Sequence, residues 1–450
     1  MRTLHLEALG VALLASCATL GAIPLGAQRA TARPNVVLII TDDIGYGDFG
    51  AYGSPDVKTP NIDRLARQGV KMTDFYANAS NCTPTRAGLI SGRYQQRVAI
   101  EWPFGYATSA DSLRGLPVTN HSLPRLLADN GYATGLVGKW HLGYKPEFSP
   151  SAHGFGYFFG FKSGFIDYYQ HTDYAGRPDF FENDTPITVP GYSTDLITEK
   201  SVEFLARNKD RPFFLDVAYN AAHWPYQDPD SPSVAIDHGR HLQPGDSATN
   251  TRKQYVKIVE RADRGVGAIM RALDSLGLAA NTILIFTNDN GGEWLSRNYP
   301  LFHNKSSLWE GGIRVPAIVR WPGHIPAGTI SGQVAITMDL SASILAATGT
   351  TVPSKPGLDG MNIFPILERR APPVERTLFW RVTHERNQLA VRSGDWKLLI
   401  DDGRPFLFDV RKDLGERDNL VGIRTDIVRK LMPLIDKWEA DVDAEAKTRS

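Results

Sequence analysis

The sequence has few cysteines, no net charge and only one long apolar run, and each shortage excludes a class of protein. Two cysteines in 450 residues cannot supply a scaffold of several disulfides. Lys plus Arg and Asp plus Glu both total 49, so no net field draws the chain to nucleic acid or to an anionic membrane. A Walker-type phosphate loop, an internal repeat and a low-complexity tract are also missing, which leaves an ordinary globular protein.

Residues 1–30 hold the apolar run and are typical of an export signal. A positive charge precedes the run, and small residues lead toward Ala27 or Ala30. A Leu-Ala-Ser-Cys sequence ending at Cys17 resembles a bacterial lipobox, so an anchored lipoprotein is the alternative to a soluble periplasmic or secreted protein. Both outcomes leave Cys82 without a disulfide partner. No later segment is apolar enough for a stable membrane span.

Two regions of different pattern follow the signal. Residues 33–349 alternate short apolar runs with helical segments, which predicts an α/β domain with a large mixed, mostly parallel sheet between helices. Residues 350–450 predict a smaller C-terminal α+β subdomain of four antiparallel strands and a helix, packed against the first. The main strands are expected at residues 35–40, 132–138, 212–219 and 282–287, with helices at 59–66 and 252–276. The later strands are expected at 378–382, 388–392, 396–400 and 405–409, and the closing helix at 423–438.

The segment around Cys82 carries a strong local signal. Thr83 can cap a helix, Pro84 suits a first helical position, and an apolar stretch follows. Cys82 is therefore expected beside free backbone N–H groups, at the positive end of a helix dipole, where an anion binds well. Arg86 lies about one helical turn later and adds a positive charge near the same place. The alternative is a buried structural cysteine beside a surface arginine.

Polar side chains follow each of the four strands expected in the main sheet. Ligands of open α/β sheets bind outside the carboxyl ends of the strands, so we expect these side chains to form one site. Taken singly, each has a simpler explanation as a solvated turn, a surface residue or a hydrogen-bonded structural histidine. The residues are Asp42 and Asp43 after the first strand, Lys139 and His141 after the second, His223 after the third, and Asp289 and Asn290 after the fourth.

The residue types indicate a hard metal ion. Asp42, Asp43, Asp289 and Asn290 offer oxygen ligands, which suit Ca²⁺ or Mg²⁺ better than Zn²⁺. Adjacent carboxylates repel each other, and a cation would hold the first two together.

Basic side chains and aromatic rings add to this pattern. Lys139 and His141 stand two apart at a strand end, so both can face one cavity. Lys305 follows in a loop that leads to the next strand, with a solvated lysine as the alternative. Residues 154–174 contain nine aromatic side chains, which we expect mostly in the core, with stacking on sugar rings as the alternative.

These segments together resemble the type I, formylglycine-dependent sulfatases of the alkaline phosphatase superfamily. Cys-x-Pro-x-Arg followed by Leu-Ile-Ser-Gly-Arg is similar to the family signature, and the other segments match in order up to about residue 316. The pattern is most similar to the arylsulfatase A and N-acetylgalactosamine-6-sulfatase branch. The resemblance implies a sulfuric ester hydrolase that acts on a sulfated saccharide, with aryl sulfates as surrogates.

The resemblance also implies a cofactor and a role for each residue. One Ca²⁺ per chain would bind Asp42, Asp43, Asp289, Asn290 and the modified Cys82, which a formylglycine-generating enzyme converts to Cα-formylglycine. The hydrated aldehyde would attack sulfur and form a covalent sulfate ester. The remaining assignments are Arg86 for orienting the modified side chain, Lys139 and Lys305 for holding sulfate oxygens, His223 for protonating the leaving alcohol and His141 for the later proton abstraction.

Two other functions are weighed against this one. A phosphate or phosphonate monoester hydrolase could use a similar site, and rates on matched aryl esters would discriminate the two. A carbohydrate-binding protein on an inactive sulfatase scaffold is the other alternative, and the complete set of expected residues argues against it.

Overall fold

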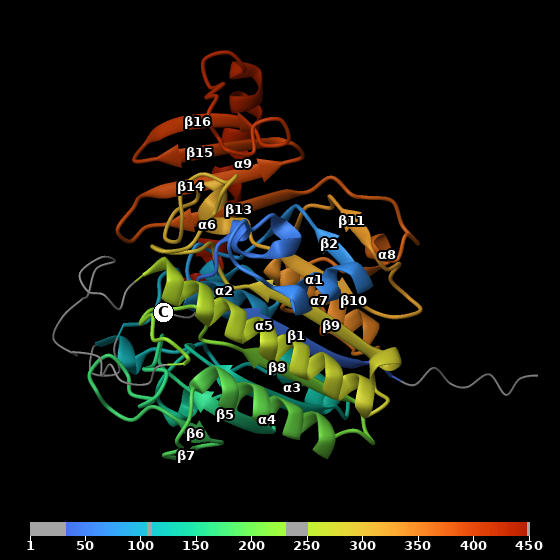
Figure 1. Cartoon of the computed structure of the whole chain (residues 1–450). Helices are drawn as coiled ribbons and strands as arrows, with labels where there is room; N and C mark the ends of the chain where they lie inside the picture. Colours follow the sequence, from blue (N-terminus) through green and yellow to red (C-terminus); the bar gives the residue numbers. More distant parts are fainter. Residues whose placement is uncertain (1–32, 106–109, 231–250, 448–450) are drawn as a thin grey trace, which may run out of the picture. The chain divides into compact units, whose positions relative to one another are not determined.

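Ten strands form one mixed sheet in the computed structural model, which describes residues 33–105, 110–230 and 251–447 (Figure 1). The strand order is β11-β2-β10-β9-β1-β8-β4-β5-β6-β7. The neighbours β9, β1, β8, β4 and β5 run parallel, whereas β10 is antiparallel to both β9 and β2. The expected mixed, mostly parallel sheet is confirmed. The signal expected at residues 1–30, and with it Cys17, lies outside the described residues.

The four strands expected in the main sheet, β1, β4, β8 and β9, agree with their expected bounds to within a residue or two, and the other strands of this sheet were not predicted. The strands of the main sheet are β1 (Asn35–Thr41), β2 (Val70–Met72), β4 (Ala133–Lys139), β5 (Tyr157–Phe161), β6 (Phe181–Glu182), β7 (Thr185–Pro186), β8 (Phe213–Ala218), β9 (Thr282–Asn288), β10 (Ala317–Arg320) and β11 (Thr329–Ser331). A separate pair joins β3 (Phe75–Tyr76) to β12 (Ala335–Ile336).

Helices cover both faces of the main sheet, which is why its central strands are apolar throughout. Val37 and Ile39 of β1 pack in one apolar cluster with α1, α4 and α5, whereas Val36 and Leu38 pack in a second with α2, α3 and α7. Successive side chains of one strand thus enter opposite cores. The helices are α1 (Pro60–Gln68), α2 (Cys82–Ser91), α3 (Leu123–Asp129), α4 (Ser193–Arg207), α5 (Arg252–Ser275), α6 (Glu310–Ile313), α7 (Thr337–Ala347) and α8 (Phe364–Leu367).

Helix α2 begins earlier than the sequence suggested, so the capping role expected for Thr83 is wrong. Asn81 is extended and Cys82 is the first helical residue. The hydroxyl of Thr83 instead accepts a hydrogen bond from the backbone N–H of Phe104, at 3.3 Å. Pro84 is tolerated inside the first turn because the first four N–H groups of a helix have no intrahelical partner. Cys82 therefore lies at the helix start, as its predicted role requires.

The second sheet lies at the C-terminal end of the chain. Its order is β13 (Thr377–Val382), β14 (Gln388–Ser393), β15 (Trp396–Asp401) and β16 (Arg404–Asp409), with every pair antiparallel as expected. Helix α9 (Thr425–Ala446) packs against it and continues past the expected end. The extra turns are held by contacts with the main domain, because Glu445 pairs with Arg93 and Asp441 with Arg97. The boundary near residue 350 stays a prediction, since the chain from Arg33 onward forms one compact unit.

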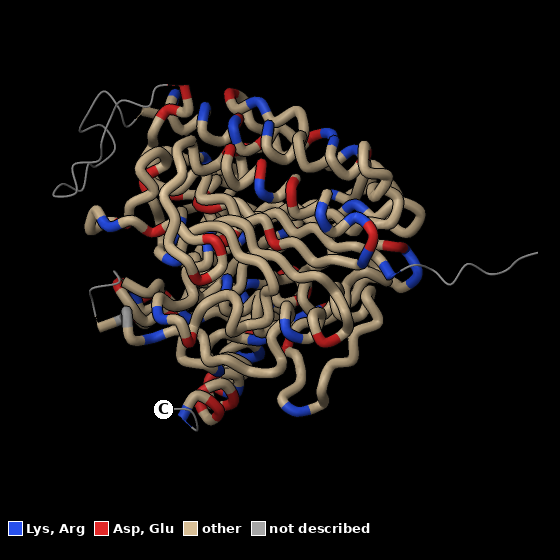
Figure 2. Tube along the Cα trace, turned by 90° about the horizontal axis from the view of Figure 1, so that it is seen from below, with Lys and Arg blue, Asp and Glu red and all other residues tan. Residues whose placement is uncertain are grey.

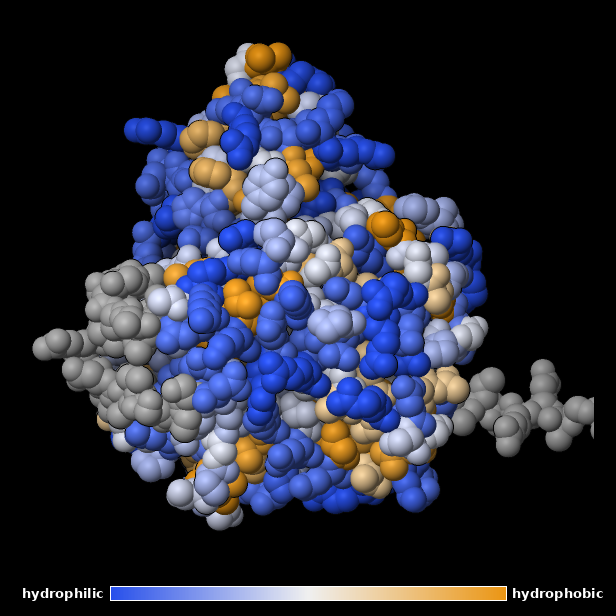
Figure 3. Space-filling model, viewed as in Figure 1, coloured by the Kyte–Doolittle hydropathy of each residue, from blue (hydrophilic) through white to orange (hydrophobic). Residues whose placement is uncertain are grey.

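The surface matches the balanced composition. Figure 2 shows positively and negatively charged residues interspersed along the trace, and Figure 3 shows apolar residues scattered among hydrophilic ones on the face in view. Among the described residues, no helix combines the length and the apolar character needed to cross a membrane.

A buried lysine links the second sheet to the main domain. Lys397 of β15 has no exposed side-chain surface, and its Nζ lies 2.9 Å from Glu310 and 2.8 Å from Glu416. Glu310 also accepts from Tyr76 at 2.6 Å and Arg314 at 3.0 Å. Burial alone would raise the pKa of Glu310, but Lys397 and Arg314 outweigh it and lower that pKa to about 2. The charges are therefore tightly paired inside the protein.

Replacing Lys397 should destabilise the protein, because it removes the ion-pair partner of buried Glu416 and one of the two cations paired with Glu310. Lys397→Met is expected to lower the free energy of unfolding by about 3–5 kcal/mol. Lys412→Met is the control, since Lys412 is exposed and pairs with Asp409 at the surface. Urea unfolding followed by circular dichroism measures both variants, and equal small losses would contradict the account.

Candidate functional site

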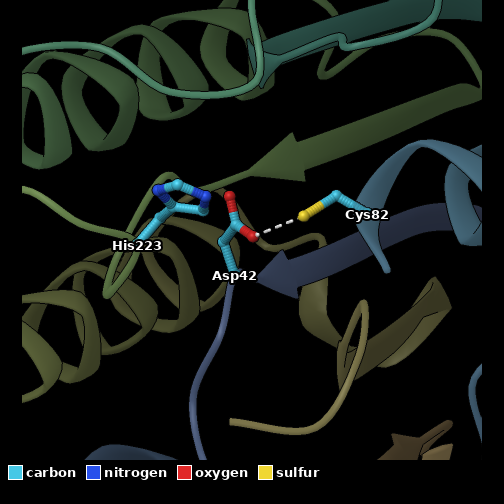
Figure 4. Close-up of side chains that lie close together, drawn as sticks. All are labelled: Asp42, Cys82 and His223. Carbon is cyan, nitrogen blue, oxygen red and sulfur yellow. Dashed lines mark hydrogen bonds between the residues drawn. The ribbon is translucent and has the colours of Figure 1, made fainter. Parts of the chain in front are cut away.

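Side chains from four strand ends and from the start of α2 meet in one buried pocket. Asp42 follows β1 and lies between Cys82 and His223 (Figure 4). The thiol of Cys82 donates to Asp42 Oδ1 at 3.3 Å. The neighbouring order β9-β1-β8-β4 brings the four strand ends together, as the sequence predicted.

Three carboxylates share this pocket with the cysteine. Asp42, Asp43, Asp289 and Cys82 are all buried, and each offers one ligand atom within 4.8 Å of the others. Asn290 joins them, because its Nδ2 donates to Asp43 Oδ1 at 2.7 Å. The groups predicted as metal ligands therefore lie in one cluster.

Each carboxylate of the cluster is paired with one cationic side chain. Lys139 Nζ lies 2.5 Å from Asp42 Oδ2, Lys305 Nζ lies 2.7 Å from Asp43 Oδ2, and Arg86 Nη2 lies 2.8 Å from Asp289 Oδ2. Side-chain exposure in these pairs is 10% or less. A buried charge is tolerated only when it is paired, so each of these side chains depends on the position of its partner.

The pairs leave the acids and the thiol in different states. Burial and Asp42 raise the pKa of Asp289 to about 6, against the pull of Arg86. Burial also raises the pKa of Asp43, but Lys305 and His223 outweigh it and hold that pKa below its usual value. Burial, Asp289 and Asp42 raise the pKa of the Cys82 thiol well above its ordinary value. An unmodified Cys82 is therefore neutral, and a neutral thiol is a poor nucleophile.

The donor set of the cluster fits a hard divalent cation. Asp289 Oδ1 and Asn290 Oδ1 are buried, and neither has a hydrogen-bond partner. Unpartnered buried oxygens are uncommon and call for an explanation. With Asp42 and Asp43 they make an oxygen-rich set of the kind that binds Ca²⁺ or Mg²⁺.

Both predicted histidines are neutral in this pocket. His141 Nε2 lies 3.2 Å from the carbonyl oxygen of Phe104, and burial followed by Lys139 lowers its pKa well below the usual value. His223 Nδ1 lies 2.7 Å from the carbonyl oxygen of Trp224, which leaves Nε2 facing Lys305 Nζ at 3.5 Å. Burial lowers the pKa of His223 to about 3, with Asp43 opposing the shift.

Two of the site residues have a left-handed backbone. The φ angles are 58° at Asp43 and 54° at His141, a conformation that non-glycine residues adopt rarely. In each case a backbone hydrogen bond of the preceding residue holds the chain there. The carbonyl oxygen of Asp42 accepts from Ala222 N at 2.7 Å, and Trp140 N donates to Phe161 O at 3.0 Å. Such strain is common where a side chain must point in one direction for function.

Comparisons with known proteins identify the family. Residues 34–350 match the sulfatase family model. Residues 299–439 match the model for the N-sulphoglucosamine sulphohydrolase C-terminal region. The chain belongs to the sulfatase family. N-acetylgalactosamine-6-sulfatase of Sus scrofa is 35% identical over 388 residues, 80% of this chain and 71% of the relative. Arylsulfatase A of Homo sapiens is 33% identical over 460 residues, 89% of this chain and 86% of the relative.

A solved structure agrees with these relatives. The crystal structure of Ps i-CgsB in complex with k-i-k-neocarrahexaose has a TM-score of 0.83 at 29% identity, covering 93% of this chain and 94% of that chain. The expected branch and the alkaline-phosphatase-like fold are confirmed. The sulfatase is a sulfuric ester hydrolase. The structure brings together every residue predicted for its site, whose individual roles stay predictions.

Sequence reasoning missed two residues of the sulfatase site. Glu293 Oε2 lies 3.4 Å from Lys305 Nζ, and burial raises its pKa to about 7 although Lys305 opposes the shift. Phe165 lies parallel to His223, with ring centroids 5.8 Å apart and planes at 6°. Glu293 follows the Asp-Asn-Gly-Gly turn directly, which was a usable signal. The aromatic run offered none, because Phe155, Phe158, Phe159, Phe161 and Tyr168 are core residues as expected.

Proposed function

We propose that this sulfatase removes sulfate from a sulfated saccharide and cleaves aryl sulfates as surrogates. One observation carries the proposal: Cys82 lies in a buried cluster with three carboxylates and His223, and each carboxylate is paired with a cationic side chain. The saccharide is supported by relatives named N-acetylgalactosamine-6-sulfatase and by a similar structure in complex with a neocarrahexaose. Export to the periplasm or the medium fits such a substrate and rests on the sequence of residues 1–30.

The proposed cofactors follow from the same pocket. Asp42, Asp43, Asp289 and Asn290 hold Ca²⁺, and a maturating enzyme converts Cys82 to Cα-formylglycine. The unpartnered oxygens of Asp289 and Asn290 support the metal, and the neutral thiol of Cys82 supports the conversion. When bound, Ca²⁺ lowers the pKa of a hydroxyl group that it contacts, and the hydrated aldehyde supplies such a hydroxyl as nucleophile.

The cationic side chains hold the sulfate group. Lys139, Lys305 and Arg86 are already fixed in place by their carboxylate partners, so no reorganisation is needed when a substrate arrives. With a divalent cation held by the same carboxylates, Lys139 and Lys305 would be available to contact sulfate oxygens. Charge that builds on these oxygens in the transition state then meets fixed positive groups, which is electrostatic preorganisation.

The two histidines move protons at opposite ends of the reaction. His223 keeps 14% of its side chain exposed, on the side from which an alcohol leaves, and protonates the departing oxygen. His141 is more deeply buried, beside Lys139, and takes a proton from residue 82 when sulfate is expelled. Both are neutral without substrate, and an anionic sulfate close by favours the protonated form that His223 needs.

Calcium should stabilise the protein through its acidic cluster. Adding Ca²⁺ to metal-free protein is expected to raise the melting temperature, because a ligand that binds only the folded state stabilises it. Asp289→Ala should abolish the rise, whereas Asp395→Ala is the control, since Asp395 is half exposed and pairs only with Arg411 among the described residues. Thermal unfolding and elemental analysis measure the effect. Stoichiometric zinc, or an intact response in Asp289→Ala, would contradict the assignment.

Loss of His223 should depend on the leaving group. A sugar alkoxide leaves poorly without a proton, whereas nitrophenolate leaves well, and general acid catalysis contributes about 10²–10⁴-fold. His223→Ala should therefore lose far more of kcat/KM on N-acetylgalactosamine 6-sulfate than on 4-nitrophenyl sulfate.

The matched variant is His141→Ala, which should slow sulfate expulsion with both substrates and accumulate sulfated protein, detected by intact mass. Equal losses for His223→Ala across leaving groups of different pKa would give this histidine another role. Release of sulfate from the aryl ester, but from neither N-acetylgalactosamine 6-sulfate nor a chondroitin 6-sulfate or carrageenan oligosaccharide, would remove the saccharide from the proposal.

A further inference from the structure

A hollow lies beside the buried cluster that is proposed to hold sulfate. Its volume is about 320 Å³, and its lining includes Glu293, Trp294, Tyr299, His303 and Asn304. Glu293 belongs to both spaces, because its Oε2 lies 3.4 Å from Lys305 Nζ. The hollow therefore lies directly next to the groups that are proposed to hold sulfate.

The hollow lies on the open side of the site. Lys139 and Asp42 have no exposed side-chain surface, whereas exposure rises to 10% at Lys305, 14% at His223 and 23% at Glu293. A sulfate ester whose sulfate lies in the deep pocket must extend its alcohol part past these three side chains. The part of the substrate beyond the scissile bond thus comes to lie beside the hollow.

Exposed aromatic side chains gather at this hollow. Two residues of its lining, Trp294 and Tyr299, are 40% and 76% exposed, and Phe302, which lies outside the lining, is 47% exposed. No other aromatic side chain of the described residues is exposed to a comparable degree. Tryptophan and tyrosine combine a flat apolar face with a polar edge, and binding sites use them where one side of the ligand is apolar and the other is hydrated.

The loop that carries these rings is firmly held. Asn298 accepts from Gly292 N at 2.9 Å and donates to Gly292 O at 3.0 Å, while Arg297 N donates to Asp48 Oδ2 at 2.8 Å. Trp294 itself has a left-handed backbone, with φ of 29°. Because the backbone of the loop is held, the positions from which the two rings extend are set before a ligand arrives, and this lowers the cost of ordering the loop on binding.

We propose that Trp294 and Tyr299 form a subsite for a sugar ring next to the one that carries the scissile sulfate, a proposal that rests on the proposed function. A pyranose ring has an apolar face of C–H groups that stacks on an aromatic ring, and hydroxyl groups at its edge. Glu293 and His303 lie in the lining where they can meet those hydroxyls. The lining thus combines two aromatic side chains, Trp294 and Tyr299, with polar groups that can fix the orientation of a ligand. The ligand class is an oligosaccharide sulfate rather than a monosaccharide sulfate.

Affinity measured without turnover tests the subsite. Calcium-loaded Cys82→Ala protein binds a chondroitin 6-sulfate tetrasaccharide or a carrageenan hexasaccharide in isothermal titration calorimetry. Adding Trp294→Ala or Tyr299→Ala should raise the Kd of the better ligand about tenfold. Trp294→Tyr keeps a ring and should restore most of the affinity. Ile330→Ala is the control, because Ile330 is an exposed apolar residue of β11, at the far edge of the main sheet.

The outcomes separate the subsite from the function. Absence of binding by both oligosaccharides, or the same Kd in the Trp294→Ala and Ile330→Ala proteins, would overturn the subsite. Sulfate release by the formylglycine-containing wild-type protein is measured separately with 4-nitrophenyl sulfate. Ring-dependent binding without any release would support the subsite and overturn the proposed catalysis, whereas release without ring dependence would do the reverse.

Discussion

Paired charges inside the protein are the constraint on which the site depends. Three carboxylates and three cationic side chains are buried together, and each would cost several kcal/mol if its partner were missing. The partners come from different strand ends, from α2 and from the loop before α6, and the observed strand order brings them together. The pairs are Asp42 with Lys139, Asp43 with Lys305 and Asp289 with Arg86. The fold therefore fixes the chemistry of the pocket before any substrate or metal binds.

The second sheet supports this pocket although it contributes no side chain to it. Lys305 lies in a loop that ends at Glu310, and Lys397 of β15 holds Glu310 by a buried ion pair. Gln388 of β14 accepts from the backbone N–H of Leu308 at 2.8 Å. The second sheet thus helps to position Lys305, the lysine that contacts Asp43.

The main sheet and the site could be predicted from the sequence wherever the residue pattern was local and strong. The central strands are continuous apolar runs, and the reactive residues stand directly after them, so sheet and site could both be predicted. Short strands such as β2 and β10 were not predicted, because three or four residues are too few to show a periodic pattern. The start of α2 was misplaced because Thr83 bonds to Phe104, a tertiary contact that no local rule contains. The same holds for Phe165, which only the folded chain brings to His223.

The chemistry finally depends on what residue 82 is. In its encoded form it is a buried cysteine whose thiol pKa is raised by burial and by two neighbouring aspartates, which favours the neutral, weakly nucleophilic thiol. The most direct measurement is the mass of the peptide that carries residue 82, taken from protein that hydrolyses 4-nitrophenyl sulfate. The account predicts Cα-formylglycine at this position and no activity in protein made without the maturating enzyme. Active protein in which the peptide holds only unmodified cysteine would contradict it.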